Sequence, residues 1–304
     1  MVIHMPIKSI AAFLAALFIA AHYAELDDKL WYQIHDLIID QGLRDRAVWL
    51  PDYQVDIDGM SIQGIVKNAS GITYNSDSNS LWVVTNEPTV LYELNDDLHV
   101  KRQVSLKDFV DTESVVYVGD DQFLLSDERS QTIVMLTIKD DTTSLDLNEL
   151  KRLSINVDGY GNKGLEGIAY DPIAKVIYTV RERDPMKLMK VHGFVEKSDM
   201  ISIEKPEQID VDELFLDDLS GLHFDTKSRN LLILSDEAKL LAEVSLQGEK
   251  VSYIDLEKGF NGLITTVTQA EGVALDAQRN LYIISEPNLI YRFKNNQTSV
   301  DLRR

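Results

Sequence analysis

The stretch from Glu166 to Glu182 contains the pattern that decides the fold. It begins Glu166-Gly167-Ile168-Ala169-Tyr170, turns at Asp171-Pro172, and ends Ile177-Tyr178-Thr179-Val180-Arg181-Glu182. Two short apolar runs separated by turn residues predict a β-hairpin. This hairpin pattern, called the phrase below, occurs five times in the chain. Its first residues, the opening positions, are Ser70, Glu113, Glu166, Ser220 and Glu271. Its last residues, the closing positions, are Glu87, Glu128, Glu182, Glu237 and Glu286.

The openings follow one another at intervals of 43 to 54 residues, and a third apolar run, such as Val90–Leu94, follows each hairpin. Units of this length with three or four strands are typical of β-propeller blades. Five units occupy nearly all of the chain after residue 52, so we predict an all-β, five-bladed β-propeller over residues 52–304. A six-bladed ring, with a sixth blade built from Gln54–Ile57 and connecting strands, is an alternative, and so is an all-β sandwich.

The N-terminal segment, residues 1–24, reads as a membrane anchor. Ser9–Ala24 contains no charged residue, and Lys8 can snorkel so that the apolar stretch reaches the ~20 residues that a membrane helix needs. A cleaved signal peptide and a buried core helix are the alternatives. Positive charge precedes the stretch and Glu25, Asp27 and Asp28 follow it, which predicts a cytoplasmic N-terminus and a propeller on the outer side.

Residues 25–51 read as an amphipathic helical linker that precedes the propeller. One helical stripe collects its apolar side chains, which are Leu26, Leu30, Trp31, Ile34, Leu37 and Ile38. Gly42 can end the helix, and Trp49-Leu50-Pro51 leads into the first strand, so we place the domain boundary near residue 51. The linker either rests on the membrane or the propeller, or continues the anchor helix.

Composition excludes several classes of function. The net charge of −20 and the lack of a basic stripe argue against nucleic-acid binding. The absence of cysteine excludes disulfides, thiolate metal sites and cysteine nucleophiles. No nucleophile elbow, phosphate loop or dinucleotide fingerprint is present. His223, inside an expected channel strand, reads as a partly buried structural histidine.

The hairpin geometry places the opening and closing positions together. A hairpin returns the chain, so the start of its first strand lies beside the end of its second. Since the first strand of each propeller blade lines the central channel, all ten positions should surround one axial opening. Two unit charges about 5 Å apart at an effective dielectric near 20 repel by roughly 3 kcal/mol, so such a ring calls for a bound cation, arginine partners or protonation.

A cation at this opening would have oxygen ligands, since no Cys or His occupies the ten positions. An irregular ring of carboxylates suits Ca²⁺ better than Mg²⁺ and disfavours Zn²⁺. We predict Glu113, Glu166 and Glu271 as the metal ligands. The residues expected around them are Glu87, Glu128, Glu182, Glu237, Glu286, Arg129, Arg181, Ser70 and Ser220. Alternatively, the closing glutamates cap loop amides or connect neighbouring blades, and arginines beside them neutralise some of the charge.

Five dispersed segments resemble the SdiA-regulated (YjiK-like) family of membrane-anchored bacterial proteins. They are Phe109–Val115, Gln122–Arg129, Gly164–Tyr170, Asp217–Gly221 and Gln269–Asp276, the last continuing to Ile284–Asn288. The resemblance implies a five-bladed propeller, distantly related to NHL-repeat propellers, with a bound calcium ion at positions matching Glu113, Glu166 and Glu271. The chain departs from the family in its longer stretch between anchor and propeller, residues 25–50.

Two functions are consistent with this picture. The first is a binding module, in which a single-pass protein of the bacterial inner membrane presents a calcium-bearing propeller face to a small ligand or a protein in the periplasm. The second is a metal-dependent hydrolase of the lactonase or phosphoesterase type, with a carboxylate such as Glu166 as the base. The sequence identifies no substrate for either.

Overall fold

The computed structural model describes residues 39–155, 164–196 and 198–295, which fall into two units divided between Asp45 and Arg46. The described part of the first unit contains one short helix, α3 (Gln41–Arg44), whose N-terminus is capped by the Asp40 side chain. No helix within the described ranges is long and apolar enough to cross a bilayer. The predicted membrane segment and most of the predicted amphipathic helix, residues 1–38, lie outside them.

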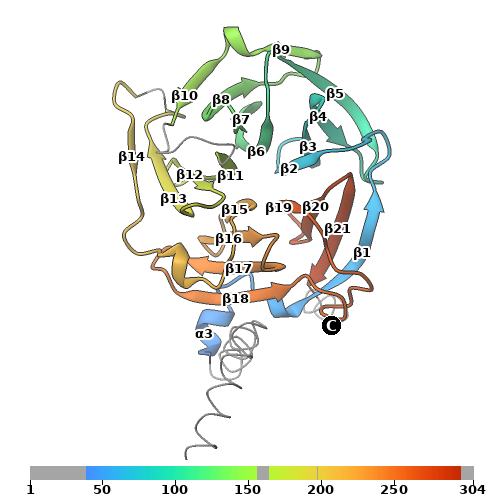
Figure 1. The fold of residues 1–304 in the computed structure, drawn as a ribbon, viewed down its shortest axis with the longest axis vertical. Coiled ribbons are helices and arrows are strands. Elements are labelled where there is room, and N and C mark those ends of the chain that lie inside the picture. Colours follow the sequence, from blue (N-terminus) through green and yellow to red (C-terminus); the bar gives the residue numbers. More distant parts are fainter. Residues whose placement is uncertain (1–38, 156–163, 197, 296–304) are drawn as a thin grey trace, which may run out of the picture. The chain divides into compact units, whose positions relative to one another are not determined.

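The described residues of the second unit form five four- or five-stranded sheets around one axis (Figure 1), which confirms the predicted five-bladed propeller. Blade 1 contains β2 (Ala69–Asn75), β3 (Ser80–Asn86), β4 (Thr89–Leu94), β5 (Val100–Lys107) and, from the next blade's connection, β9 (Ser144–Asp146). Blade 2 contains β6 (Thr112–Gly119), β7 (Gln122–Asp127), β8 (Thr132–Thr137) and β10 (Lys151–Ser154). The remaining blades follow the same plan.

Blade 3 contains β11 (Leu165–Asp171), β12 (Val176–Arg181), β13 (Lys187–His192) and β14 (Ser202–Glu204). Blade 4 contains β15 (Gly221–Asp225), β16 (Asn230–Ser235), β17 (Leu240–Ser245) and β18 (Lys250–Asp255). Blade 5 contains β19 (Ala270–Leu275), β20 (Leu281–Ser285), β21 (Leu289–Asn295) and β1 (Tyr53–Ser61). Short 3₁₀ turns occur at Leu50–Asp52, Leu147–Glu149 and Val211–Glu213.

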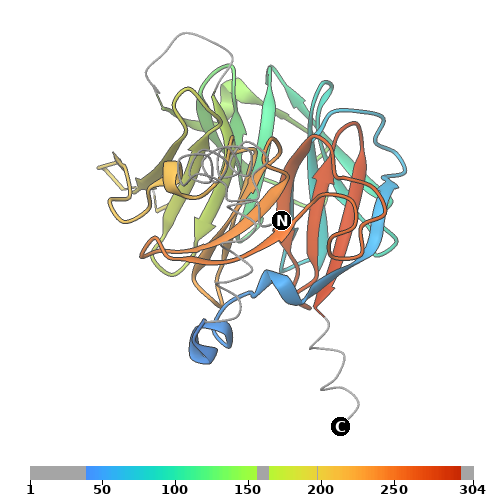
Figure 2. The ribbon, with the colours of Figure 1, turned by 60° about the horizontal axis from the view of Figure 1, so that its bottom comes forward.

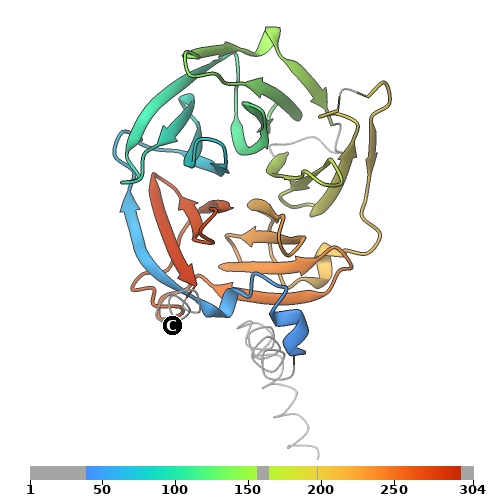
Figure 3. The ribbon, with the colours of Figure 1, turned by 180° about the vertical axis from the view of Figure 1, so that it is seen from behind.

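The ring closes through β1, the first strand in the chain. β1 pairs antiparallel with β21, from Tyr53 opposite Asn295 to Ser61 opposite Leu289. The blue strand therefore lies beside the red one in all three ribbon views (Figures 1, 2 and 3). Residues 54–57, the nucleus of the alternative sixth blade, belong instead to the outer edge of blade 5.

The innermost strands form a tight cycle, because each contacts the innermost strand of the next blade and β19 contacts β2. The glycine after the opening position explains how closely they approach. A Cβ added to Gly71 would lie 2.7 Å from the Cα of Ser114, and one added to Gly272 would lie 3.0 Å from the backbone nitrogen of Ile72. Glycine is favoured where two backbones come this close.

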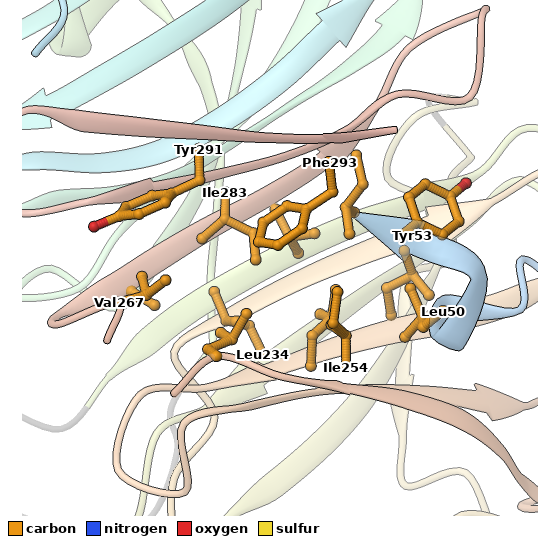
Figure 4. Packing of buried hydrophobic residues seen from close by; sticks show 14 of the residues in the cluster. Leu50, Tyr53, Leu234, Ile254, Val267, Ile283, Tyr291 and Phe293 are labelled. Atoms are coloured by element: carbon orange, nitrogen blue, oxygen red, sulfur yellow. The ribbon is translucent and has the colours of Figure 1, made fainter. Parts of the chain in front are cut away.

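The hydrophobic core lies between the blades. Leu234 and Ile254 of blade 4 pack against Ile283 and Phe293 of blade 5 in one such cluster (Figure 4), and Leu50 extends it beyond the start of β1. All five are at most 1% exposed. Burying an aliphatic or aromatic side chain of this size contributes about 1.5–3 kcal/mol, so each interface stabilises the ring substantially.

A buried carboxylate fastens the chain that leads into β1. Glu243, on β17 and fully buried, accepts hydrogen bonds from the backbone nitrogens of Val48 (2.7 Å) and Trp49 (3.0 Å). It also accepts from the side chains of Asn230 (2.7 Å) and Ser252 (2.6 Å). Four donors thus compensate the cost of burying this charge.

Candidate functional site

Four of the five opening residues occupy β-bulges. In blades 1, 2, 3 and 5, the pairing of the first two strands skips one residue, which is Ser70, Glu113, Glu166 or Glu271. A bulge leaves its extra residue without a cross-strand partner and re-aims its side chain. The bulges therefore free these side chains from the blade faces at the end of the ring where the innermost strands begin.

A cavity of about 350 Å³ lies at this end of the ring. Its lining includes every opening and closing residue except Ser70 and Glu87, namely Glu113, Glu128, Glu166, Glu182, Ser220, Glu237, Glu271 and Glu286. The rest of the lining is Asn86, Arg183, Asp218, Asp236 and Gln269. Of the other predicted residues, Arg129 and Arg181 lie outside this lining. Eight of the ten opening and closing positions therefore line one cavity, as the hairpin geometry predicts.

Blade 1 departs from this arrangement. The side chain of Glu87 is 79% exposed and pairs with Lys67 at 3.4 Å, and the Ser70 hydroxyl donates to a neighbouring backbone carbonyl. Asn86, one residue before the closing position, lines the cavity instead and donates from Nδ2 to Glu113 Oε1 at 3.2 Å. Blade 1 therefore contributes an amide rather than a carboxylate.

The arginines neutralise only part of the acidic charge. Arg183 donates to the carboxylates of both Glu182 and Glu237, and so joins blades 3 and 4 at the rim. Arg129 pairs with Asp111 at 3.0 Å, not with a closing glutamate, and its side chain is 58% exposed. Among the described residues that line the cavity, Arg183 is the only cationic side chain.

Burial and mutual repulsion raise the pKa values of the carboxyls that remain unpaired. Burial, with the nearby charges of Asp111 and Glu128, raises the pKa of Glu113 to about 8. Burial, followed by the charge of Glu113, also raises the pKa of Glu271 to about 8. The same two causes raise the pKa of Glu166 well above its ordinary value. Without a counter-charge, these three groups would therefore hold protons at neutral pH.

One set of oxygens in the described ranges is already close enough for a common ion. Carboxylate oxygens of Asp111, Glu113 and Glu128 lie within 4.8 Å of one another. Nearby, Oδ1 of Asn86 is buried and has no hydrogen-bond partner among the described residues. Of the predicted triad Glu113, Glu166 and Glu271, only Glu113 belongs to this set. The charge of Glu113 also raises the pKa values of Glu166 and Glu271.

Sequence reasoning missed Asp111, Asp218 and Gln269, although a signal for them exists. Each precedes an opening position by two residues, as Asn68 and Gly164 do in blades 1 and 3. The side chain of Asp218 accepts from the Ser235 hydroxyl and from the backbone nitrogen of Glu237 (3.0 Å). In blade 4, the polar residue two positions before the opening therefore holds the loop that leads to Glu237 at the cavity rim.

The donor set suits a hard cation. Carboxylates and an amide oxygen surround the cavity, and no histidine is among its described lining residues. Oxygen-only coordination with several carboxylates is the ligand set of Ca²⁺. The unpartnered Asn86 Oδ1 and the repelling carboxyls of Glu113, Glu166 and Glu271 are groups that such an ion would satisfy.

Fold and cavity together define a five-bladed β-propeller with an acidic axial cavity. A family model described as SdiA-regulated matches residues 45–294, so the chain belongs to the SdiA-regulated family. Among solved structures, regucalcin from Agrobacterium tumefaciens str. C58, described as a calcium-binding protein, is similar with a TM-score of 0.52 at 11% identity over 78% of this chain and 93% of that one.

Two further solved structures show the same likeness of fold. Glutaminyl cyclase from Myxococcus xanthus aligns with a TM-score of 0.50 at 9% identity, covering 80% of this chain and 96% of that one. A luciferin-regenerating enzyme aligns with a TM-score of 0.50 at 11% identity over 80% and 96%. The differing activities in these names show that the shared fold does not determine function.

Proposed function

We propose that the acidic cavity binds a calcium ion, and that the ion-bearing face is a binding site for a small anionic ligand or a protein partner. The observation that carries the proposal is the group of buried carboxyls, from three blades, that have no cationic partner among the residues the structure describes. Glu113, Glu166, Glu271 and the Asn86 amide oxygen would hold the ion, with Asp111 and Glu128 beside Glu113. A bound ion would neutralise the ring and leave coordination positions for an anionic group.

The test compares calcium-dependent stability in matched variants of the full-length protein. Calcium should raise the Tm and a chelator should reverse the shift, because an ion that binds only the folded state stabilises it. Glu271→Gln should remove most of the shift. Glu87→Gln is the matched control. It makes the same substitution, and removes one carboxylate from a closing position, but the side chain of Glu87 is exposed. No shift at millimolar calcium, or equal losses in both variants, would overturn the proposal.

We further propose that the protein is a single-pass protein of the bacterial inner membrane with its propeller in the periplasm. The support is the uncharged stretch Ser9–Ala24, preceded by Lys8 and followed by acidic residues. In spheroplasts, added protease should degrade the propeller while a cytoplasmic marker stays intact. Protection of the propeller until the membrane is lysed would contradict this orientation.

A second candidate is metal-dependent hydrolysis, favoured by the raised pKa values in the cavity. A bound cation would polarise a carbonyl or phosphoryl group. A carboxyl such as Glu271, with a pKa of about 8, could exchange protons near neutral pH, and Glu166 is the candidate base. Turnover of a lactone or phosphoester panel should be lost in Glu166→Gln. Turnover that persists in this variant at full calcium occupancy would exclude that role for Glu166.

A further inference from the structure

A second ring of side chains surrounds the opposite end of the propeller axis. The fifth residue of each opening phrase lies four positions after the opening residue, toward the other end of the innermost strand. These residues are Tyr74, Tyr117, Tyr170, Phe224 and Leu275, one from each blade, and all of them line a cavity of about 500 Å³. Figures 1 and 3 view the propeller from its two ends. No residue lines both cavities, so the two are separate.

Three of the four aromatic side chains in this ring of residues have hydrogen bonds or ring contacts that hold them in place. The Tyr117 hydroxyl donates to Asp77 at 2.6 Å, and the Tyr74 hydroxyl donates to Asn79 at 2.7 Å. The ring of Phe224 stacks with that of Tyr178 at 5.9 Å between centroids. Preorganised aromatic rings bind a flat or chair-shaped ring with little loss of conformational entropy.

His223 breaks the symmetry of the cavity. The fourth phrase residue is Thr or Val in blades 1 and 2 and Ala in blades 3 and 5, but it is a histidine in blade 4. His223 lines the cavity, and neither of its ring nitrogens forms a hydrogen bond with any residue in the described ranges. A neutral imidazole offers one donor and one acceptor, so both remain available to a ligand.

Burial lowers the pKa of His223 to about 4, with Arg279 also lowering it and Asp225 opposing. The ring is therefore uncharged at neutral pH.

The charges that line the second cavity balance one another. Asp225 accepts hydrogen bonds from both terminal nitrogens of Arg279, and Asp276 accepts from its own turn, including Asn280 Nδ2 at 2.6 Å. Lys227 completes the balance as a second cation against these two acids. The lining is thus neutral in sum, in contrast to the acidic cavity, and it includes both apolar and polar surface. A neutral ligand meets no electrostatic penalty here.

We propose that this cavity is a second binding site, for a neutral ring-shaped organic molecule with hydroxyl or amide groups at its edge. The side chains of Tyr74, Tyr117 and Tyr170 would pack against the apolar face of the ligand, and His223 would hydrogen-bond to the polar groups at its edge. Monosaccharides and nucleosides share this chemistry. The site is independent of the calcium proposal, because its residues do not overlap with the acidic cavity.

The test is saturation-transfer NMR on the full-length protein with two panels, one of neutral monosaccharides and one of nucleosides. At least one panel should receive saturation and shift the ring resonances of His223. His223→Ala should weaken binding at least tenfold; this variant should fold, because Ala occupies the same position in blades 3 and 5. Glu271→Gln, in the other cavity, should leave the affinity unchanged.

Three results would overturn the proposal. They are no saturation transfer to either panel, equal affinity in the wild-type protein and the His223→Ala variant, and an equal loss of affinity in Glu271→Gln. The panel that binds decides between a sugar and a nucleoside. Thermal unfolding of each variant checks that a lost signal reflects the site rather than the fold.

Discussion

Calcium binding to the acidic cavity should release protons and weaken steeply as the pH falls. The pKa values of Glu113 and Glu271 are both about 8, whereas free glutamic acid titrates near 4.5. Between pH 6 and pH 7 both carboxyls are mostly protonated, and each must lose its proton to ligate the ion. At least two protons should therefore leave for each ion bound, and Glu166, whose pKa is also raised well above its ordinary value, should add a third. For Glu113 and Glu271 alone, the affinity should fall about 100-fold from pH 7 to pH 6, or about 2.7 kcal/mol at 1.36 kcal/mol per unit for each group, and deprotonation of Glu166 steepens the fall.

Isothermal titration calorimetry in two buffers of different ionisation enthalpy measures the number of protons released for each ion bound. The Glu271→Gln variant removes one of the titrating carboxyls, so its residual binding should release about one proton fewer than the wild-type protein. Glu87→Gln should release as many protons as the wild-type protein. An affinity that is the same at pH 6 and pH 8, or no proton release at pH 6.5, would show that these carboxyls do not hold the ion.

The other predictions concern stability. Glu243→Gln places an amide NH₂ against groups that donate, which costs about 2–4 kcal/mol and should lower the Tm by roughly 5–15 °C in calorimetry; an unchanged Tm would contradict the anchoring role of this carboxylate. Gly71→Ala sets a Cβ 2.7 Å from the Cα of Ser114 and should cost about 1–3 kcal/mol in urea unfolding, whereas a neutral result would show that the innermost strands can move apart. The metal-free protein should lose stability as the pH rises from about 4.5 to 8, because the raised pKa values of Glu113 and Glu271 mean that the folded state holds more protons than the unfolded chain in that range; urea unfolding at pH 5 and pH 8 tests the sign.

The fold could be predicted from the sequence because its signals are local and repeated. The apolar runs and turn residues of each repeat indicate its two strands and its turn, and the five repeats indicate five blades. The way in which the ring closes could not be predicted from such local signals, because the closing strand is far in sequence from the strand with which it pairs. Tyr53 lies opposite Asn295, and nothing in the sequence near residue 53 indicates that pairing.

The site was predictable only in part, because identical local sequences have different surroundings. Glu87 and Glu286 both end a phrase and both precede a proline, yet Glu286 lines the acidic cavity and Glu87 is exposed beside Lys67. In blade 1, Asn86 contacts Glu113 instead. The difference arises from contacts between neighbouring blades, which a repeat within one blade does not encode.

The adjacent Glu and Gly of the opening phrase have different functions, and three blades carry only one of the two: blades 1 and 4 keep the glycine, and blade 2 keeps the glutamate. Blade 4 keeps the glycine, Gly221, where an added Cβ would lie 3.0 Å from the carbonyl oxygen of Glu271, but has Ser220 in place of the glutamate. Blade 2 keeps Glu113 but replaces the glycine with Ser114, whose hydroxyl accepts from the backbone nitrogen of Ile168 at 3.1 Å and so links blades 2 and 3. The innermost strands thus stay in contact in blades that lack either the glutamate or the glycine, while the charge in the cavity depends on the first residue. The acidic cavity can therefore change composition, blade by blade, without altering the ring that supports it.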